Sequence, residues 1–120
     1  LGVMMIPLDR FGSWRSYAAA DAIASQYPGA LREVALQAAS GTRRLDVLTP
    51  QGLAIESKVG RTSLTRATRQ QIQRDVELMN DRLSGVSSVE WHFGTSPITG
   101  RGGPTGPLEA ELRAAGIGIR

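Results

Sequence analysis

The sequence predicts an α/β domain in which helices flank a mixed central β-sheet. Three observations support this fold class: a turn sequence between two apolar runs, a long segment with helical periodicity, and a segment in which apolar residues alternate. They lie at residues 50–52, about 64–83 and about 86–93. With 120 residues, 41% of them hydrophobic, the chain can form one hydrophobic core. We therefore expect residues 1–120 to fold as a single domain.

The first third of the chain is expected to be helical. Ser13 can cap a helix that continues to about Ser25, and the Tyr-Pro-Gly sequence at residues 27–29 would end it. A second helix is expected from about residue 30 to residue 41, because apolar residues recur there at helical spacing. These residues are Leu31, Val34, Ala35 and Ala38. We interpret residues 1–29 as a helical extension and residues 30–120 as the core.

A β-hairpin is expected around residues 50–52. Proline suits the first turn position, and Gly52 can adopt a positive φ. Directly opposed residues on paired strands share a face, with Cβ atoms about 4.5 to 5.5 Å apart. The expected register pairs Thr49 with Leu53, Val47 with Ile55 and Asp46 with Glu56.

Side chains alternate along a strand, so the hairpin is expected to have two different faces. Lys58 would lie on the same face as Asp46 and Glu56. The other face would pack against the core, and it would carry Leu45, Val47, Ile55, Ser57 and Val59.

The rest of the chain supplies the remaining elements of the α/β fold. The helix from about residue 64 to 83 would bury Ile72, Val76, Met79 and Leu83, and the following strand would turn Trp91 inward. Residues 95–107 contain four glycines and three prolines and form either a flap or a long connection. A short helix at residues 108–115 and a strand at residues 117–119 would complete the sheet.

The charged face of the hairpin has the composition of a metal site. Two carboxylates held close together repel unless a cation lies between them, and oxygen ligands suit Mg²⁺ or Mn²⁺. Asp46 and Glu56 are the candidate ligands, and the backbone carbonyl of Ser57 could add a third. The alternative is a solvated cluster of cross-strand salt bridges, each worth about 0.2 to 1 kcal/mol.

Lys58 is a candidate catalytic residue because it is the only lysine among 14 cationic side chains. Arginine is a fixed, planar cation, whereas lysine is a compact point charge whose proton affinity depends on its surroundings. Beside a scissile phosphate, Lys58 could orient the attacking water or stabilise developing negative charge.

Positive charge is concentrated around this face. Between Arg43 and Arg74 there are seven basic and two acidic residues, a net charge of +5, compared with +3 for the whole chain. This distribution favours a polyanionic partner such as nucleic acid, although an ordinary basic surface would look the same. The candidate phosphate-binding residues are Arg43, Arg44, Arg61, Arg66, Arg69 and Arg74.

Residues 30–120 resemble the restriction-endonuclease-like toxin domains of the PD-(D/E)xK superfamily. The resemblance is carried by Arg-Arg-Leu-Asp at 43–46, Ile-Glu-Ser-Lys at 55–58, Arg-Gln-Gln-Ile-Gln-Arg-Asp at 69–75 and Val-Glu-Trp-His-Phe at 89–93. These domains are nuclease tips of bacterial polymorphic toxins, including contact-dependent growth inhibition effectors. The resemblance implies a restriction-endonuclease-like core, and it implies that the chain is the C-terminal tip of a longer protein.

The resemblance also implies residue roles. Asp46, Glu56 and Lys58 match the catalytic motif, and Gln71 matches a glutamine that supports the site from the following helix. Gln71 could equally be a surface residue of that helix. Glu33 is the candidate for an acidic residue on the first core helix, although the helical periodicity places it opposite the apolar stripe, as for a solvated glutamate. Leu45 departs from the family pattern, which has proline there.

The function implied is hydrolysis of phosphodiester bonds with Mg²⁺ or Mn²⁺ as cofactor. DNA is the leading substrate, and tRNA is the alternative. A non-catalytic basic module that binds nucleic acid is the alternative of another class. The resemblance further implies a cognate immunity protein, expected to be acidic, and delivery into the cytoplasm of a target cell.

Composition limits other classes of function. The chain has no cysteine, which excludes disulfides and thiolate metal sites. No stretch approaches the roughly 20 apolar residues that span a bilayer, so no membrane segment is expected.

Overall fold

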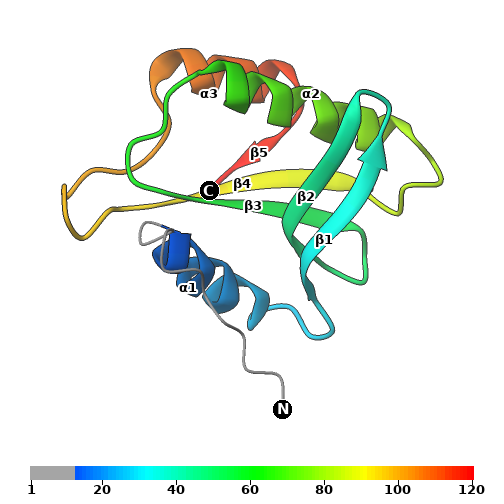
Figure 1. Cartoon of the computed structure of the whole chain (residues 1–120), viewed down its shortest axis with the longest axis horizontal. Helices are drawn as coiled ribbons and strands as arrows, with labels where there is room; N and C mark the ends of the chain where they lie inside the picture. Colours follow the sequence, from blue (N-terminus) through cyan, green and yellow to red (C-terminus); the bar gives the residue numbers. More distant parts are fainter. Residues whose placement is uncertain (1–12) are drawn as a thin grey trace.

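The computed structural model describes the chain from residue 13 to residue 120, and side chains from residue 17 (Figure 1). One helix is followed by three strands, after which helices and strands alternate. In chain order the elements are α1 (Ser13–Ala24), β1 (Leu31–Ala38), β2 (Gly41–Leu48), β3 (Leu53–Val59), α2 (Arg66–Asn80), β4 (Ser88–Gly94), α3 (Gly106–Ala114) and β5 (Gly118–Ile119).

The strands form one mixed sheet in the order β1-β2-β3-β4-β5. Strand β2 is antiparallel to both β1 and β3, whereas β3 pairs with β4 and β4 with β5 in parallel. Helices α2 and α3 lie over one face of the sheet, and α1 lies over the other (Figure 1). The expected α/β fold with a mixed sheet flanked by helices is confirmed.

Two apolar clusters fill the space between these layers. The larger lies between the sheet and helices α2 and α3, and it includes Trp91, Leu45, Leu78, Leu108 and Leu112, each no more than 2% exposed. The smaller joins Ala20 of α1 to Val47 and Ile55. Helix α1 falls within the segment interpreted as an extension, yet it packs on the sheet against β1, β2 and β3 and takes part in the core.

The second expected helix is wrong, because residues 31–38 form strand β1. Val34 pairs with Leu45, and Leu36 with Arg43, in an antiparallel ladder with β2. The apolar residues of this segment fit a helical stripe, but Val34, Leu36 and Ala38 also alternate with a period of two. Pairing with β2 packs those three side chains into the larger cluster, and this tertiary gain decides the conformation.

The hairpin register is confirmed at the turn, but the expected pair of Asp46 with Glu56 does not form. Val47 pairs with Ile55, and the Thr49 N–H donates to the Leu53 carbonyl at 2.9 Å. Gly52 has a φ of +87°, and its N–H closes the turn on the Thr49 carbonyl. A side chain at residue 52 would meet the backbone of Gly85 and Ser87, so glycine is required there.

The expected division of the hairpin faces is wrong. Leu45 packs in the larger cluster beside α2, whereas Val47 packs in the smaller one beside α1. Strand β2 therefore changes faces at Asp46, which lies between them. The face that carries Glu56 also carries most of the hydrophobic core, so neither face is purely apolar or purely charged.

The C-terminal half follows the sequence expectations except at the end of α2. The helix ends at Asn80, and Leu83, which was expected to be buried on it, is 95% exposed. Thr65 caps α2: its side chain accepts from the Thr68 N–H, while the Thr68 hydroxyl accepts from the Thr65 N–H. The long loop before α3 is a fixed connection, because Thr62 bonds through its backbone to both Gly103 and Thr105. Within the described residues, no helix has the length and apolar character needed to cross a bilayer.

Candidate functional site

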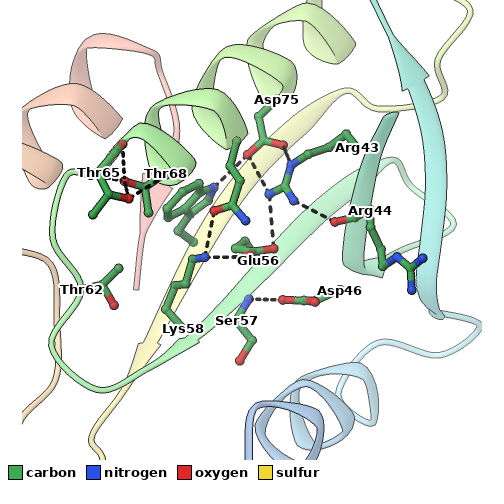
Figure 2. A network of polar contacts seen from close by, with 12 residues as sticks. Arg43, Arg44, Asp46, Glu56, Ser57, Lys58, Thr62, Thr65, Thr68 and Asp75 are labelled. Atoms are coloured by element: carbon green, nitrogen blue, oxygen red, sulfur yellow. Dashed lines mark hydrogen bonds and ion pairs between the residues drawn. The ribbon is translucent and has the colours of Figure 1, made fainter. Parts of the chain in front are cut away.

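The candidate site lies where strands β2 and β3 diverge. Their ladder contains only the pairs Val47 with Ile55 and Leu48 with Ala54. At the next position outward the Asp46 carboxylate replaces a backbone partner, and its Oδ2 accepts the Ser57 N–H at 2.8 Å (Figure 2). The divergence leaves the Asp46 side chain beside Glu56 at the edge of β3.

Glu56 is held by a cation on each side. Its Oε2 lies 3.0 Å from Lys58 Nζ, and its Oε1 lies 3.2 Å from Arg43 Nη2 (Figure 2). Lys58 Nζ also donates to Gln71 Oε1 at 2.8 Å and lies 5.2 Å from the centre of the Trp91 ring. Helix α2 therefore brings Gln71 to the lysine, and the structure gathers Asp46, Glu56, Lys58 and Gln71 in one place.

Behind Glu56 lies a buried ion pair that the sequence did not reveal. Asp75 of α2 is 0% exposed and accepts from Arg43 Nε at 2.8 Å and from the Trp91 ring N–H at 2.9 Å. Burial raises the pKa of Asp75, even though Arg43 and the Trp91 N–H favour its charged form. A buried pair of this kind is costly to desolvate, and what it supplies is a defined geometry behind the site.

Arg43 does not occupy the surface position expected of a phosphate ligand. It is only 5% exposed, and it donates to Asp75, to Glu56 and to the backbone carbonyl of Arg44. In the sequence Arg43 looks like part of a basic run. On β2, however, it lies two residues before buried Leu45, on the same buried face. Its charge offsets two carboxylates inside the protein and leaves none for an external anion.

The remaining candidate arginines differ in their surroundings. Arg74 donates to the backbone carbonyls of Thr42 and Ser40, so it holds the turn between β1 and β2. Arg69 is exposed and pairs with Glu111 at 3.4 Å. The other three candidates, Arg44, Arg61 and Arg66, are exposed and form no ion pair with a carboxylate of the described residues.

Asp46 has the most perturbed environment in the site. Its pKa is raised from 3.8 to about 7, first by burial and then by the negative charge of Glu56, while the Ser57 N–H partly opposes the shift. Glu56 has two cationic neighbours, but Asp46 has only a backbone donor. The pair therefore lacks one positive charge at the position between the carboxylates.

The oxygen atoms around this position are the ones that could hold a divalent cation. Asp46 and Glu56 provide carboxylates, and the C=O of Ser57 projects to the same strand edge as its N–H, toward Asp46. Hard cations such as Mg²⁺ and Mn²⁺ prefer oxygen ligands and keep several water ligands. Among residues 13–120 no group of three or more His, Cys, Asp or Glu gathers, so two carboxylates, a carbonyl and water would have to suffice.

Glu33 does not lie on a helix as expected. It is half-buried in β1 with a φ of +53°, next to the point where β2 changes faces. The helix that covers this side of the sheet is α1, and its acidic residue is Asp21, which pairs with Arg32. Sequence reasoning gave no role in the site to Arg32 or Asp75. Asp75 lies in the segment at 69–75 that carries the resemblance, but its partner Arg43 is 32 residues away, and no local pattern connects the two.

Comparisons with known proteins bear on the fold. No family model and no curated protein matches the sequence. Among solved structures, the chain is similar to AF1548, described as a protein of unknown function, with a TM-score of 0.60 and 14% sequence identity. The match covers 88% of this chain and 55% of that protein, so this chain spans about half of its length. The similarity supports a compact α/β fold with a five-stranded mixed sheet.

Proposed function

We propose that this domain is a divalent-metal-dependent endonuclease with a restriction-endonuclease-like core. One observation carries the proposal: Asp46, Glu56 and Lys58 converge where β2 and β3 diverge, and Gln71 is bonded to the lysine. The spacing of these residues matches the PD-(D/E)xK motif, and the mixed sheet with helices on both faces is compatible with such a core.

The residues would divide the work as follows. Asp46, Glu56 and the Ser57 carbonyl would hold Mg²⁺ or Mn²⁺, which when bound would neutralise phosphate charge and lower the pKa of a bound water. Lys58 carries three N–H donors, and two of them point to Glu56 and Gln71. The third is free to donate to the attacking water or to a phosphate oxygen, where charge develops during hydrolysis.

DNA is the proposed substrate class, and the phosphate backbone is the proposed point of contact. Arg44, Arg61 and Arg66 are exposed without acidic partners, and such charges bind a polyanion without reading its sequence. The chain contains only 5% aromatic residues, few for a platform that stacks unpaired bases. A tRNA substrate would use the same residues at the site.

A non-catalytic binding module is the second candidate, and one observation favours it. Lys58, Glu56, Arg43 and Asp75 form a connected cluster of ion pairs that satisfies its members without any substrate. In that case the exposed arginines would bind nucleic acid, and the cluster would serve the fold alone.

The role of a toxin with an acidic immunity protein is proposed from the sequence resemblance. Expression of the domain in a bacterial cytoplasm should then arrest growth, and Lys58→Ala should relieve the arrest. Growth at the normal rate with the wild-type domain present in folded form would contradict this role.

The nuclease proposal is tested by incubating the purified domain with supercoiled plasmid and with total tRNA, in Mg²⁺ and in EDTA. Asp46→Asn, Glu56→Gln and Lys58→Ala should each reduce cleavage to the level seen in EDTA. Glu109→Gln, an exposed acid of α3 paired with Arg113, is the matched control and should cleave normally. Binding without cleavage of either substrate would contradict the nuclease proposal and favour the non-catalytic binding module.

A further inference from the structure

The ladder between β1 and β2 is broken at one point, opposite the candidate site. Every pair from Leu31 with Leu48 to Ala38 with Gly41 is present except Glu33 with Asp46. At the break Glu33 has a φ of +53°, the one positive value at a non-glycine position in residues 13–120. A positive φ is unfavourable for a residue with a side chain, so the surrounding contacts must hold it in place.

Arg32, the residue before Glu33, bonds at the break in the ladder. Its Nε donates to the backbone carbonyl of Asp46 at 3.0 Å, where a strand partner would otherwise bond. Its Nη1 pairs with Asp21 of α1, and its guanidinium lies 5.9 Å from the centre of the Tyr17 ring. One side chain therefore connects α1 to the backbone of a proposed metal ligand. The Arg32 side chain is only 20% exposed, so this connection lies largely within the protein.

The consequence appears on the other side of β2. Leu45 faces α2 and Val47 faces α1, so the strand rotates at Asp46. The rotation points the Asp46 carboxylate at the Ser57 N–H across the gap between β2 and β3. A regular ladder between β1 and β2 would remove the rotation and with it this contact.

We propose that Arg32 is a positioning residue for Asp46, which holds the Asp46 backbone in the rotated conformation that directs its carboxylate to β3. The proposal rests on the proposed function only in that Asp46 is taken to be a metal ligand. Arginine suits the task because its planar fork can donate in two directions at once, to a carbonyl and to a carboxylate. Lysine keeps the charge but has no such fork.

The test compares Arg32→Lys with Arg82→Lys, a matched change at an exposed arginine near the end of α2. Two quantities are measured: hydrogen exchange at the Ser57 amide in metal-free protein, and Mn²⁺ affinity by calorimetry. Arg32→Lys should accelerate Ser57 exchange at least about tenfold relative to the other core amides. It should also weaken Mn²⁺ binding about tenfold, as losing an outer contact to a metal ligand does. Asp21→Asn removes only the anchor on α1 and should shift both quantities in the same direction by less.

The outcomes separate the two proposals. Unchanged exchange at Ser57 in both Arg32→Lys and Asp21→Asn would overturn the positioning role. Uniformly faster exchange of all core amides, with Mn²⁺ affinity unchanged, would also overturn it, because Arg32 would then support only the fold. A third outcome is possible, in which the variants exchange faster only at Ser57 but the wild-type protein binds no Mn²⁺ and cleaves nothing. This would support the positioning of Asp46 and would overturn the nuclease proposal. If Arg32→Lys does not fold, Asp21→Asn decides between these results.

Discussion

Glu56 and Asp46 are neighbouring carboxylates with opposite surroundings. Glu56 is 7% exposed, and each of its oxygens has a cationic partner, Arg43 on one side and Lys58 on the other. Asp46 accepts one backbone N–H, and its pKa is raised to about 7 by burial and by the charge of Glu56. The protein has neutralised one carboxylate and has left the other short of a cation.

This difference shows how the fold prepares the site. The Glu56 side is completed by α2, through the buried pair of Arg43 with Asp75 and through Gln71. On the Asp46 side lie the break in the β1 ladder and the contact of Arg32 with the Asp46 carbonyl. In the proposed site, protein charges neutralise the Glu56 half, and a divalent cation would neutralise the Asp46 half.

The largest expected effect comes from breaking the Glu56 side. Arg43→Leu should lower the free energy of unfolding by about 3–5 kcal/mol, because it leaves buried carboxylates without their partner. Arg69→Leu, which breaks an exposed pair with Glu111, should cost about 0–1 kcal/mol. Urea denaturation measures both. Equal losses in the two variants would mean that the buried network is not what holds Glu56.

The pH dependence of stability sharpens the contrast on the Asp46 side. With a pKa of 3.8 when unfolded and about 7 when folded, Asp46 binds more protons in the folded state between these values. Metal-free protein should therefore lose stability as the pH rises from about 4 to about 7, by up to about 4 kcal/mol from this group. Denaturation in EDTA at several pH values measures the loss. Asp46→Asn should show a smaller loss over the same range, and an identical pH dependence would contradict the raised pKa.

A smaller effect is expected where α2 meets Lys58. Gln71→Ala should reduce kcat about tenfold with little change in stability, because Lys58 loses the acceptor that fixes its direction. Gln73→Ala serves as the control. Gln73 lies on the same helix, and its exposed side chain donates to Glu77. Steady-state cleavage of a defined duplex separates kcat from KM. Equal activity in the two variants would mean that Gln71 is an ordinary surface residue of α2 without a role in catalysis.

The smallest effect is expected at the strained residue of β1. Glu33→Gly should raise the free energy of unfolding by about 0.5–1 kcal/mol, because glycine adopts a φ of +53° without a steric penalty. Gln37→Gly, at an exposed position of the same strand without positive φ, should instead lower it by about 0.5–1 kcal/mol. Thermal denaturation distinguishes the signs. If Glu33→Gly gains stability but loses cleavage, the Glu33 side chain has a role in catalysis.

Local patterns predicted the parts of the fold that local interactions decide. The turn at Gly52 fixed the pairing of Val47 with Ile55, and apolar periodicity placed α2. The segment at residues 31–38 was misread because its apolar residues fit both a helical stripe and an alternating strand. Pairing with β2, which lies later in the chain, chose between them.

The candidate site was predicted in its composition but not in its surroundings. Asp46, Glu56, Lys58 and Gln71 were identified from spacing and resemblance, and they do converge. The burial of Arg43 depends on Asp75, 32 residues further along the chain, and no local pattern connects the two. The rotation of β2 at Asp46 depends on a positive φ at Glu33, a residue type that gives no such signal.

Mn²⁺ titration of the metal-free domain, by calorimetry at pH 6 and pH 8, tests the central claim that Asp46 and Glu56 form a site short of one cation. We expect one bound ion, bound more tightly at pH 8 because the Asp46 carboxyl, with a pKa of about 7, has then released its proton. Asp46→Asn should abolish this binding, and Glu109→Gln should leave it unchanged. No binding by the wild-type domain, or equally tight binding by Asp46→Asn, would contradict the claim.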